Sequence, residues 1–388
     1  MKVTQIHTIV NNATAAILGE SAVLNEDLSN IVDVGKALID TDNLDNYVKS
    51  LVNHIGKVVF VDRLYAGGVP SVMMDSWEYG SIMEKISSDL PQATESDSWK
   101  LTNGEDYSPD VFYKPEISVK FFNSKTTFEI PLSFTEKQIK ESFSNANQLN
   151  GFISMLTTSV ENSMTVKLDS LIMRTINNMI GETVVDGLTV EGEPTYDPTI
   201  TSVKAVNLLN LYNANYGTSL AKSDAIKDAD FIRYATYMMG LYIDRLSRIS
   251  KLFNVGGKEK FTPKSDQHVV LLSDFAKASE TFLLSSAQNQ ERVTLPEHET
   301  VPYWQGSGEG YAFEDVSKID VMTSTGKSVE LDGILGVIFD RQALGVSNLD
   351  RRVTTNYNPK AEFYTNFYKF DAGYYNDLDE NFIVFFMG

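Results

Sequence analysis

Four histidines and several groups of acidic residues are the side chains of this sequence best equipped for chemistry. A metal site needs ligands held close together, and no two of the histidines lie at ligand spacing. One of them stands between two glutamates in LPEHETVPYW, but that polar stretch is more typical of a solvated loop than of a cation site. The sequence therefore predicts no metal centre and no bound cofactor. The four are His7, His54, His268 and His298.

Paired carboxylates could supply general acid and base catalysis if the fold held them in a cleft. Glu105 and Asp106 are adjacent, and Asp377, Asp379 and Glu380 lie together near the end of the chain. Because the chain has 52 acidic residues, such groups often arise by chance, and these fall in turn-rich sequence. We interpret them as solvated turns, so the sequence predicts no enzyme.

Two glycine-rich stretches resemble phosphate-binding motifs only in part. The stretch NVGGKEKF, at 254–261, lacks the upstream glycine of a P-loop and the Ser or Thr that follows its lysine. The stretch GSGEG, at 306–310, has neither the preceding strand nor the βαβ unit of a dinucleotide-binding fold. We interpret both as loops. The chain has no cysteine, which excludes disulfides, thiolate nucleophiles and zinc–thiolate clusters.

The composition indicates a globular, acidic protein. The 388 residues suffice for two or three domains, and a hydrophobic content of 42% suffices for a packed core. The formal charge of −19 disfavours nucleic-acid binding through a basic surface, because that affinity comes mostly from neutralised phosphates. No apolar run approaches the ~20 residues of a membrane helix, and no signal-peptide pattern is present, so we expect a soluble protein made in the cytoplasm.

One long amphipathic helix dominates the pattern of predicted elements. Apolar residues recur at helical spacing between 147 and 180, which predicts a rod of roughly 50 Å at ~1.5 Å per residue. We expect this helix to be a stiff spine on which sheets and loops are mounted. Its predicted buried stripe includes Leu156, Val160, Leu168 and Leu171.

The elements on both sides of this helix are predicted to be mixed. The segments ISVKFF and TTFEIPL flank Asn123 and Ser124, which predicts a β-hairpin leading into the helix. The acidic stretch 87–114 has no periodicity, and a loop of that length usually packs on another element. After Gly181 we expect a short strand at 185–190, helices at 203–212 and 231–253, a buried strand and a helix within 268–286, and a strand-rich tail.

Three stretches resemble the major capsid proteins of tailed bacteriophages, which have the HK97 fold. They are SWEYGSIMEKIS (76–87), FFNSKTTFEIPLSFTEKQIKESF (121–143), and FDRQALGV (339–346) followed by YNPKAEFYTNFYKFDAGYYNDLDENFIVFF (357–386). The order of elements is similar over nearly the whole chain. The resemblance implies an α+β, HK97-like fold with an N-terminal arm (1–60), a region with an extended loop, the E-loop (61–132), a peripheral domain with the spine helix (133–187), an axial α/β domain (188–345), and strands of the peripheral sheet that return to the axial domain (346–388).

The resemblance also implies a function in the virion. Family members assemble through hexamers and pentamers into an icosahedral head shell around packaged double-stranded DNA, which they enclose without sequence-specific binding. The implied partners are other copies of the chain, a portal protein and an optional decoration protein, with no membrane, and assembly takes place in the host cytoplasm. No scaffolding-like segment precedes the arm, so we expect a separate scaffolding protein. The candidate interface anchors are three aromatic residues in or near the E-loop, Trp77, Tyr79 and Trp99.

Two other functions are open to this sequence. An encapsulin-type compartment would use the same fold to enclose a cargo enzyme, although such shells usually have smaller subunits. A soluble α/β enzyme would need a pocket with convergent polar groups and perturbed ionisable residues, and the motifs above supply none.

Overall fold

The structure is a computed structural model that places part of the chain. By internal packing the chain divides into unit 1 (1–80, 124–172 and 346–373) and unit 2 (81–123, 173–345 and 374–388). The described residues are 69, 72–74, 82–91, 93, 95–96, 98, 100–107, 110, 112–135, 146–193, 195–286, 297–306 and 310–388.

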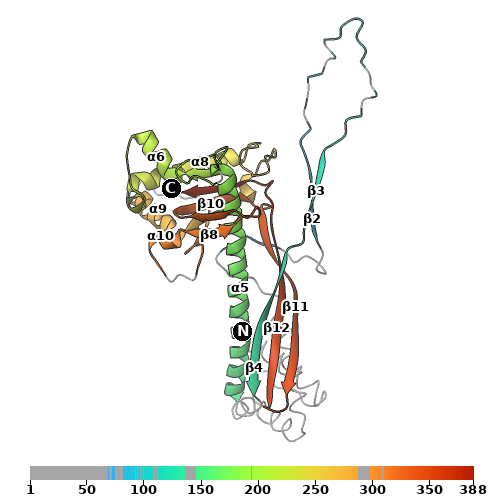
Figure 1. Ribbon diagram of the computed structural model, residues 1–388, viewed down its shortest axis with the longest axis vertical. Helices are drawn as coiled ribbons and strands as arrows, with labels where there is room; N and C mark the ends of the chain where they lie inside the picture. Colours follow the sequence, from blue (N-terminus) through green and yellow to red (C-terminus); the bar gives the residue numbers. More distant parts are fainter. Residues whose placement is uncertain are drawn as a thin grey trace. The chain divides into compact units, whose positions relative to one another are not determined.

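Helices and strands alternate along the described residues (Figure 1). The helices are α5 (Ala146–Leu188), α6 (Leu208–Tyr216), α7 (Lys222–Ala225), α8 (Ala229–Leu246), α9 (Ser273–Ser286) and α10 (Phe313–Val316), with a 3-10 turn, η4 (Lys264–Asp266). The strands are β1 (Met73–Met74), β2 (Met83–Ser88), β3 (Ile117–Phe122), β4 (Lys125–Thr135), β5 (Ala205–Asn207), β6 (Gln267–Leu272), β7 (Glu299–Val301), β8 (Ile319–Met322), β9 (Ser328–Leu331), β10 (Ile334–Asp340), β11 (Leu344–Asn358), β12 (Phe363–Asn376) and β13 (Phe382–Phe386).

Unit 1 is built on a four-stranded sheet in the order β1-β11-β12-β4. Strands β12 and β4 are antiparallel over a long register, from Phe363 opposite Thr135 to Gly373 opposite Lys125. Side chains alternate along β12, so that Tyr364, Tyr368 and Phe370 are buried between less buried neighbours. This is the alternation expected of a sheet with one covered face.

Helix α5 has 43 residues and exceeds the predicted length at its C-terminal end. Val160, Leu168 and Leu171, from the predicted stripe, are all buried, as are Ile172 and Ile176. The fourth residue of that stripe, Leu156, lies in α5, but its side chain is outside the described residues.

Unit 2 has a five-stranded mixed sheet in the order β5-β13-β10-β6-β7. Strand β10 lies in the centre and is antiparallel to both of its neighbours, whereas the two outer pairs are parallel. Every residue of β10 and β13 is buried, because these strands form the middle of the unit's core. Helix α8 packs against α6 and α9, and Tyr242 of α8 meets Phe385 of β13 edge to face at 5.3 Å between ring centroids.

The predicted hairpin between ISVKFF and TTFEIPL is wrong. Strand β3 pairs with β2, and β4 pairs with β12, so the two adjacent segments belong to different sheets. The two segments are close in sequence, which favoured pairing between them, but all 11 residues of β4 pair with residues of β12, far along the chain. Long-range burial therefore overrode a local turn signal.

Three other predicted elements also differ from the structure. The strand expected at 185–190 is mostly helical, because Val184 and Leu188 continue the buried stripe of α5 to its end. The helix expected at 203–212 is replaced by β5 and then α6, because Asn207 caps α6 by accepting a hydrogen bond from the backbone of Asn210 at 3.0 Å. The helix expected to reach 253 ends at Leu246.

None of the helices in the described part of the chain combines the length and hydropathy that spanning a bilayer needs.

The buried strand and the helix expected within 268–286, and the strand-rich tail, are confirmed as β6, α9 and β10–β13.

Candidate functional site

A two-stranded ribbon in unit 2 has two lysines on its inner face and several large apolar side chains on its outer face. Strands β2 and β3 are antiparallel and enclose the loop 89–116. On the outer face Ile86, Val119 and Phe121 are exposed, at 65%, 45% and 64%. On the inner face Lys85 and Lys120 are half-buried and lie directly opposite each other. Two opposed ammonium groups repel each other, so this pairing requires anions beneath it.

The turn between β12 and β13 supplies those anions. Lys85 Nζ lies 2.6 Å from an oxygen of Asp377 and 2.6 Å from Glu380. Lys120 Nζ lies 2.7 Å from the other oxygen of Asp377 and 2.6 Å from Asp379. Asp377 is only 2% exposed, and each of its carboxylate oxygens accepts from one lysine. We call these five residues the ionic anchor of the ribbon.

The electrostatics of the anchor favour the charged forms of both partners. Burial alone would raise the pKa of Asp377, but hydrogen bonds from Lys120 and Lys85 outweigh it and lower the pKa below 3.8. Burial would lower the pKa of Lys120, but hydrogen bonds to Asp377 and Asp379 raise it above 10.5. Asp377 and Lys120 therefore both favour their charged forms across the neutral range.

A loop after α8 completes the base of the ribbon. Lys260 Nζ lies 3.0 Å from Glu380, and Lys258 Nζ lies 2.9 Å from Asp89, where the chain leaves β2. The backbone N–H of Gly256 donates to the carbonyl of Leu378 at 2.8 Å. A Cβ at position 256 would collide with the carboxylate of Asp379. Gly256 therefore serves close packing, whereas Gly257 adopts a positive φ of 64° with open space around it. Both lie in a loop, as predicted.

Asp377, Asp379 and Glu380 were interpreted above as chance neighbours in a solvated turn, and that interpretation is wrong. The turn is real, but two of its three carboxylates are almost fully buried. The sequence signal for the anchor is one lysine in MEKISS and one in ISVKFF, which lie opposite each other on the inner face of the ribbon. No local sequence pattern shows that these two strands pair.

The candidate interface anchors Trp77, Tyr79 and Trp99 all lie outside the described residues, so their role stays a prediction. The loop that the sequence pattern indicated is present. Each described residue of 90–116 is exposed, including Phe112 and Tyr113 at 85% each. Glu105 and Asp106 lie in this exposed loop, as expected.

No group of three metal-ligating side chains occurs among the residues that the structure describes. His268 stacks on Phe339 at 5.6 Å between ring centroids, and burial lowers its pKa, which is typical of a packed histidine. His298 immediately precedes β7. His7 and His54 are outside the described residues.

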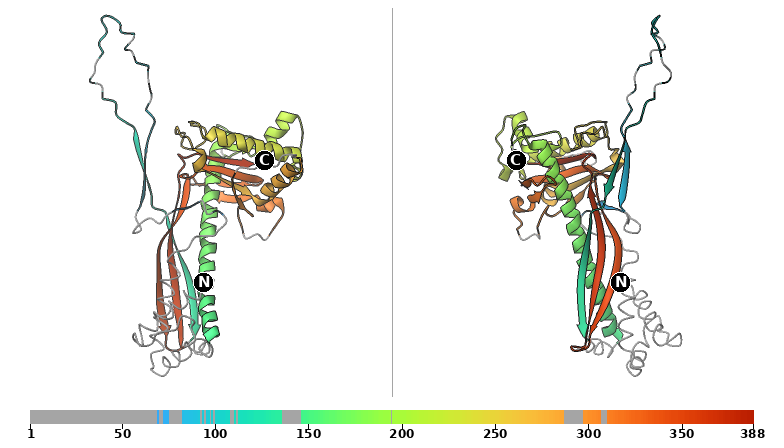
Figure 2. Two further views of the ribbon diagram at one scale, coloured as in Figure 1. Left: turned by 180° about the vertical axis from the view of Figure 1, so that it is seen from behind. Right: turned by 45° about the vertical axis from the view of Figure 1, so that its right-hand side comes forward.

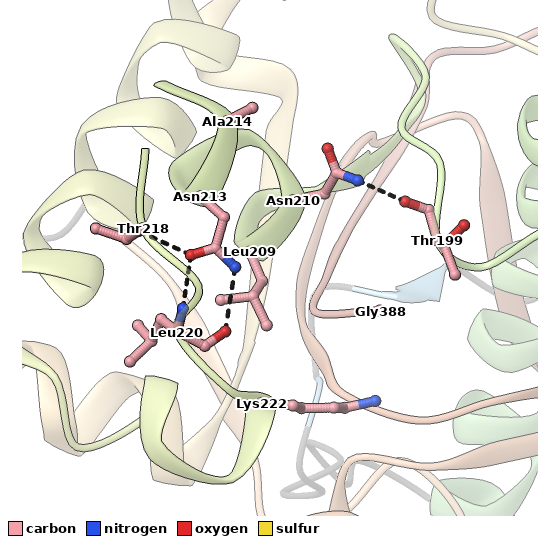
Figure 3. A pocket seen from close by; sticks show the side chains of 9 residues that line it. All are labelled: Thr199, Leu209, Asn210, Asn213, Ala214, Thr218, Leu220, Lys222 and Gly388. Carbon is pink, nitrogen blue, oxygen red and sulfur yellow. Dashed lines mark hydrogen bonds between the residues drawn. The ribbon is translucent and has the colours of Figure 1, made fainter. Parts of the chain in front are cut away.

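A shallow cavity of about 560 Å³ lies beside α6 in unit 2 (Figure 3). The Asn213 side chain in its wall is already satisfied, because its amide oxygen, Oδ1, accepts from the Thr218 hydroxyl and the Leu220 backbone N–H at 2.8 and 2.9 Å. Lys222 at its edge pairs with Asp332 at 2.6 Å. The cavity therefore offers no convergent set of reactive groups for catalysis. Its lining is Thr199, Leu209, Asn210, Asn213, Ala214, Thr218, Leu220, Lys222 and Gly388.

The site is thus an anchored ribbon that exposes apolar side chains, and comparison with known proteins identifies its setting. The family model of the Phi29-like phage major capsid protein matches residues 6–386. The chain belongs to this family. It is accordingly a structural protein of a phage capsid, located in the virion shell. Its fold is α+β, with a long helix, an extended loop between two paired strands and a mixed sheet carrying helices.

Individual relatives are distant. The major capsid protein of Bacillus phage GA-1 is 27% identical over 172 residues, which are 42% of this chain and 34% of that protein. The match thus spans about a third of the relative's length. Among solved structures, the capsid of Staphylococcus phage Andhra is similar at 10% identity and a TM-score of 0.48, covering 84% of this chain and 86% of that one. The capsid of cyanophage P-SCSP1u is similar at 10% identity and a TM-score of 0.48, covering 82% and 86%.

Proposed function

We propose that this chain is the subunit that assembles, as hexamers and pentamers, into an icosahedral head shell around double-stranded DNA. The observation that carries the proposal is the family match over residues 6–386, which spans residues of both units. An encapsulin-type compartment is not favoured by these comparisons, since the matching family is a phage family.

The ribbon and its loop support the proposal. A shell subunit contacts several neighbours, so part of its surface is stable only when another copy covers it. The outer face of the ribbon presents four large apolar side chains to solvent, Ile117 at 61% among them, and the loop beyond it exposes two adjacent aromatics. Exposed apolar groups concentrated in this way mark interaction surfaces.

We assign domain roles within the same proposal. The sheet of unit 1 and the first part of α5 would form the peripheral domain, and the helix-bearing sheet of unit 2 would form the axial domain. The loop 89–116 would be the tip of the E-loop. The N-terminal arm, expected at 1–60, lies outside the described residues.

The proposed partners are a portal protein, a separate scaffolding protein and an optional decoration protein. DNA would be enclosed without sequence-specific binding, in keeping with a formal charge of −19. Assembly would take place in the host cytoplasm.

Expression of the full chain with and without a scaffolding partner tests the proposal. Size-exclusion chromatography and negative-stain microscopy should show closed shells of uniform size. A small oligomer under every condition would contradict the proposal and favour the soluble-enzyme alternative.

A further inference from the structure

Four dipeptides of this chain place Asn or Asp directly before glycine. In such a pair the backbone nitrogen of the glycine can attack the carbonyl carbon of the preceding side chain, because glycine has no side chain that shields its nitrogen. Asparagine is accordingly one of the thermolabile residues of proteins. The fold decides which pairs can react, since the attack needs a free N–H and a backbone that can rotate. The pairs are Asn103–Gly104, Asn150–Gly151, Asp186–Gly187 and Asp332–Gly333.

The structure protects three of the four pairs. Residues 150–151 and 186–187 lie within helix α5, where helical hydrogen bonding engages the backbone N–H groups and fixes the dihedral angles. Gly333 donates its N–H to the hydroxyl of Ser317 at 3.0 Å, and a Cβ at its position would collide with the carbonyl oxygen of Met387. These three pairs reach the geometry of attack only after local unfolding.

The pair Asn103–Gly104 lies instead in the loop 89–116. Figure 2 shows this loop continuing beyond the paired strands β2 and β3. Both residues of the pair are exposed, and no atom lies within 4 Å of the position that a Cβ on Gly104 would take. Neither the Asn103 amide nor the Gly104 N–H forms a hydrogen bond with the residues that the structure describes. The attacking and the attacked group are therefore both free.

A weak turn is what orders this pair. The Glu105 N–H donates to the Thr102 carbonyl at 3.3 Å, and the φ of +96° at Gly104 is typical of a type II turn with glycine at its third position. The Tyr107 hydroxyl reinforces the turn, because it accepts from the Thr102 N–H at 2.9 Å and donates to the Glu105 carboxylate at 3.3 Å. Opening this turn breaks few hydrogen bonds, whereas opening a long helix breaks many.

We propose that Asn103 is a site of spontaneous deamidation, through which the loop 89–116 changes its charge and its backbone with time. A base removes the proton of the Gly104 N–H, and the nitrogen attacks Cγ of Asn103. The new C–N bond closes a cyclic imide, and the side-chain nitrogen leaves as ammonia. Water then adds to one carbonyl of the imide and breaks the bond from that carbonyl to nitrogen, which gives aspartate or isoaspartate. The chain and water are the only reactants.

The products differ from asparagine in charge and, for isoaspartate, in backbone length. Either product adds a negative charge to a loop that has seven acidic residues and two lysines. In isoaspartate the backbone runs through the side-chain carboxyl carbon, so a methylene group is inserted between Thr102 and Glu105. The hydrogen bond that closes the turn then loses its register. This inference concerns the unassembled chain and does not rest on the proposed function.

Peptide mass spectrometry of the full, unassembled chain after incubation in mildly alkaline buffer tests the proposal. Peptides with Asn103 should gain the mass difference between an amide and an acid, and an isoaspartyl methyltransferase should label the same peptides. Asn103 should react at least about tenfold faster than Asn150, because the helix must open first. In guanidinium chloride the two sites should react at similar rates, since each is followed by glycine.

Three variants separate the chemistry from the turn. Asn103→Gln should abolish the modification, because the longer side chain would have to close a larger ring. Tyr107→Phe should speed the modification by about threefold or more, since the turn loses the hydroxyl that joins its two ends. Tyr113→Phe is the matched control, because it removes the hydroxyl of another tyrosine of this loop, one that is 85% exposed, and should leave the rate unchanged.

Two results would overturn the proposal. One is an equally slow reaction of Asn103 and Asn150 in the folded chain, with modification only after denaturation. The other is a rate in Tyr107→Phe that does not exceed the rate in Tyr113→Phe, which would show that the turn does not control the reaction. Because every measurement uses the unassembled chain, neither result depends on whether shells form.

Discussion

At the scale of single residues, Asp377 governs whether two lysines can face each other across the ribbon. Its carboxylate is buried and accepts from both Lys85 and Lys120. Without it the two ammonium groups would remain opposed and only partly compensated by Asp379 and Glu380. The anchor therefore depends more on this acid than on either base.

Replacement of Asp377 by Asn should lower the free energy of unfolding by about 2 kcal/mol, less than for a fully buried pair because Lys120 is 35% exposed. Lys120→Met should cost less, since Lys85 still pairs with Asp377. Urea denaturation of the unassembled chain measures both. Glu95→Gln, which breaks the exposed pair with Lys100, should change nothing measurable. Equal losses for Asp377→Asn and Glu95→Gln would show that the anchor is unimportant.

The lowered pKa of Asp377 fixes the direction of its pH dependence. Its contribution to stability is fully present above its unfolded pKa of about 3.8 and is lost as the pH falls through the lower folded value. The unfolding free energy should therefore decline below about pH 4, and more gently in Asp377→Asn. Some decline should persist in this variant, because a hydrogen bond from Arg352 lowers the pKa of Asp371 as well. Denaturant titrations between pH 2 and pH 6 measure the slopes, and identical slopes would argue against the assignment.

At the scale of elements, helix α5 and the loop after α8 owe their positions to close packing. One side of α5 is buried from Val160 to Leu188, which makes the helix part of the core of both units. The loop at 254–260 approaches the turn before β13 so closely that position 256 has no room for a side chain.

Leu171→Ala should lower the free energy of unfolding by about 2 to 4 kcal/mol, because it leaves a cavity next to a buried stripe. Val166→Ala, on the 65% exposed side of the same helix, is the matched control and should be nearly neutral. Chemical denaturation followed by circular dichroism measures the difference. Similar effects from the two changes would mean that α5 is not packed as described.

Gly256→Ala and Gly240→Ala should have opposite signs. The added methyl at position 256 meets Asp379, with its Cγ at 2.9 Å and its Cα at 3.2 Å, and should cost about 1 to 3 kcal/mol. The methyl at position 240 meets nothing within 4 Å in helix α8 and should stabilise by up to about 1 kcal/mol. Thermal unfolding of both variants measures the signs. A stable Gly256→Ala chain would refute the close approach.

At the scale of the whole molecule, the loop 89–116 contributes little to the chain's own fold. Its described residues after Asp89 are all exposed, so they bury little surface within the chain. We expect them to act through contacts with other molecules. This separates folding from assembly within one polypeptide.

Replacement of 90–115 by an Asn-Gly turn between β2 and β3 should therefore preserve folding and abolish shells. Shortening a loop changes its closure entropy by about 1 kcal/mol or less, so the unassembled chain should unfold at nearly the same denaturant concentration. A Gly/Ser loop of the original length is the control for loop length and should also fail to assemble. Circular dichroism, chromatography and microscopy follow the two properties. Normal shells from either variant would rule out a role of the loop in assembly.

The sequence by itself determined the elements whose signal is local. Side-chain spacing predicted the helical period of α5 and the buried runs in HVVLLS and FIVFF, and the structure has both. Of the non-periodic stretch predicted at 87–114, residues 87 and 88 belong to β2, and the described residues from 90 onward are exposed loop. Three motif stretches also sufficed to indicate the family, because they preserve an order of elements over the whole chain.

Tertiary structure alone decided the pairings between distant segments. Strand β4 could have paired with β3 but joined β12, about 240 residues later, because that register buries the greater length of strand. The carboxylates of 377–380 became an anchor because two strands from the first third of the chain bring lysines above them. Such choices rest on the free energy of burying whole surfaces together, which no window of local sequence contains.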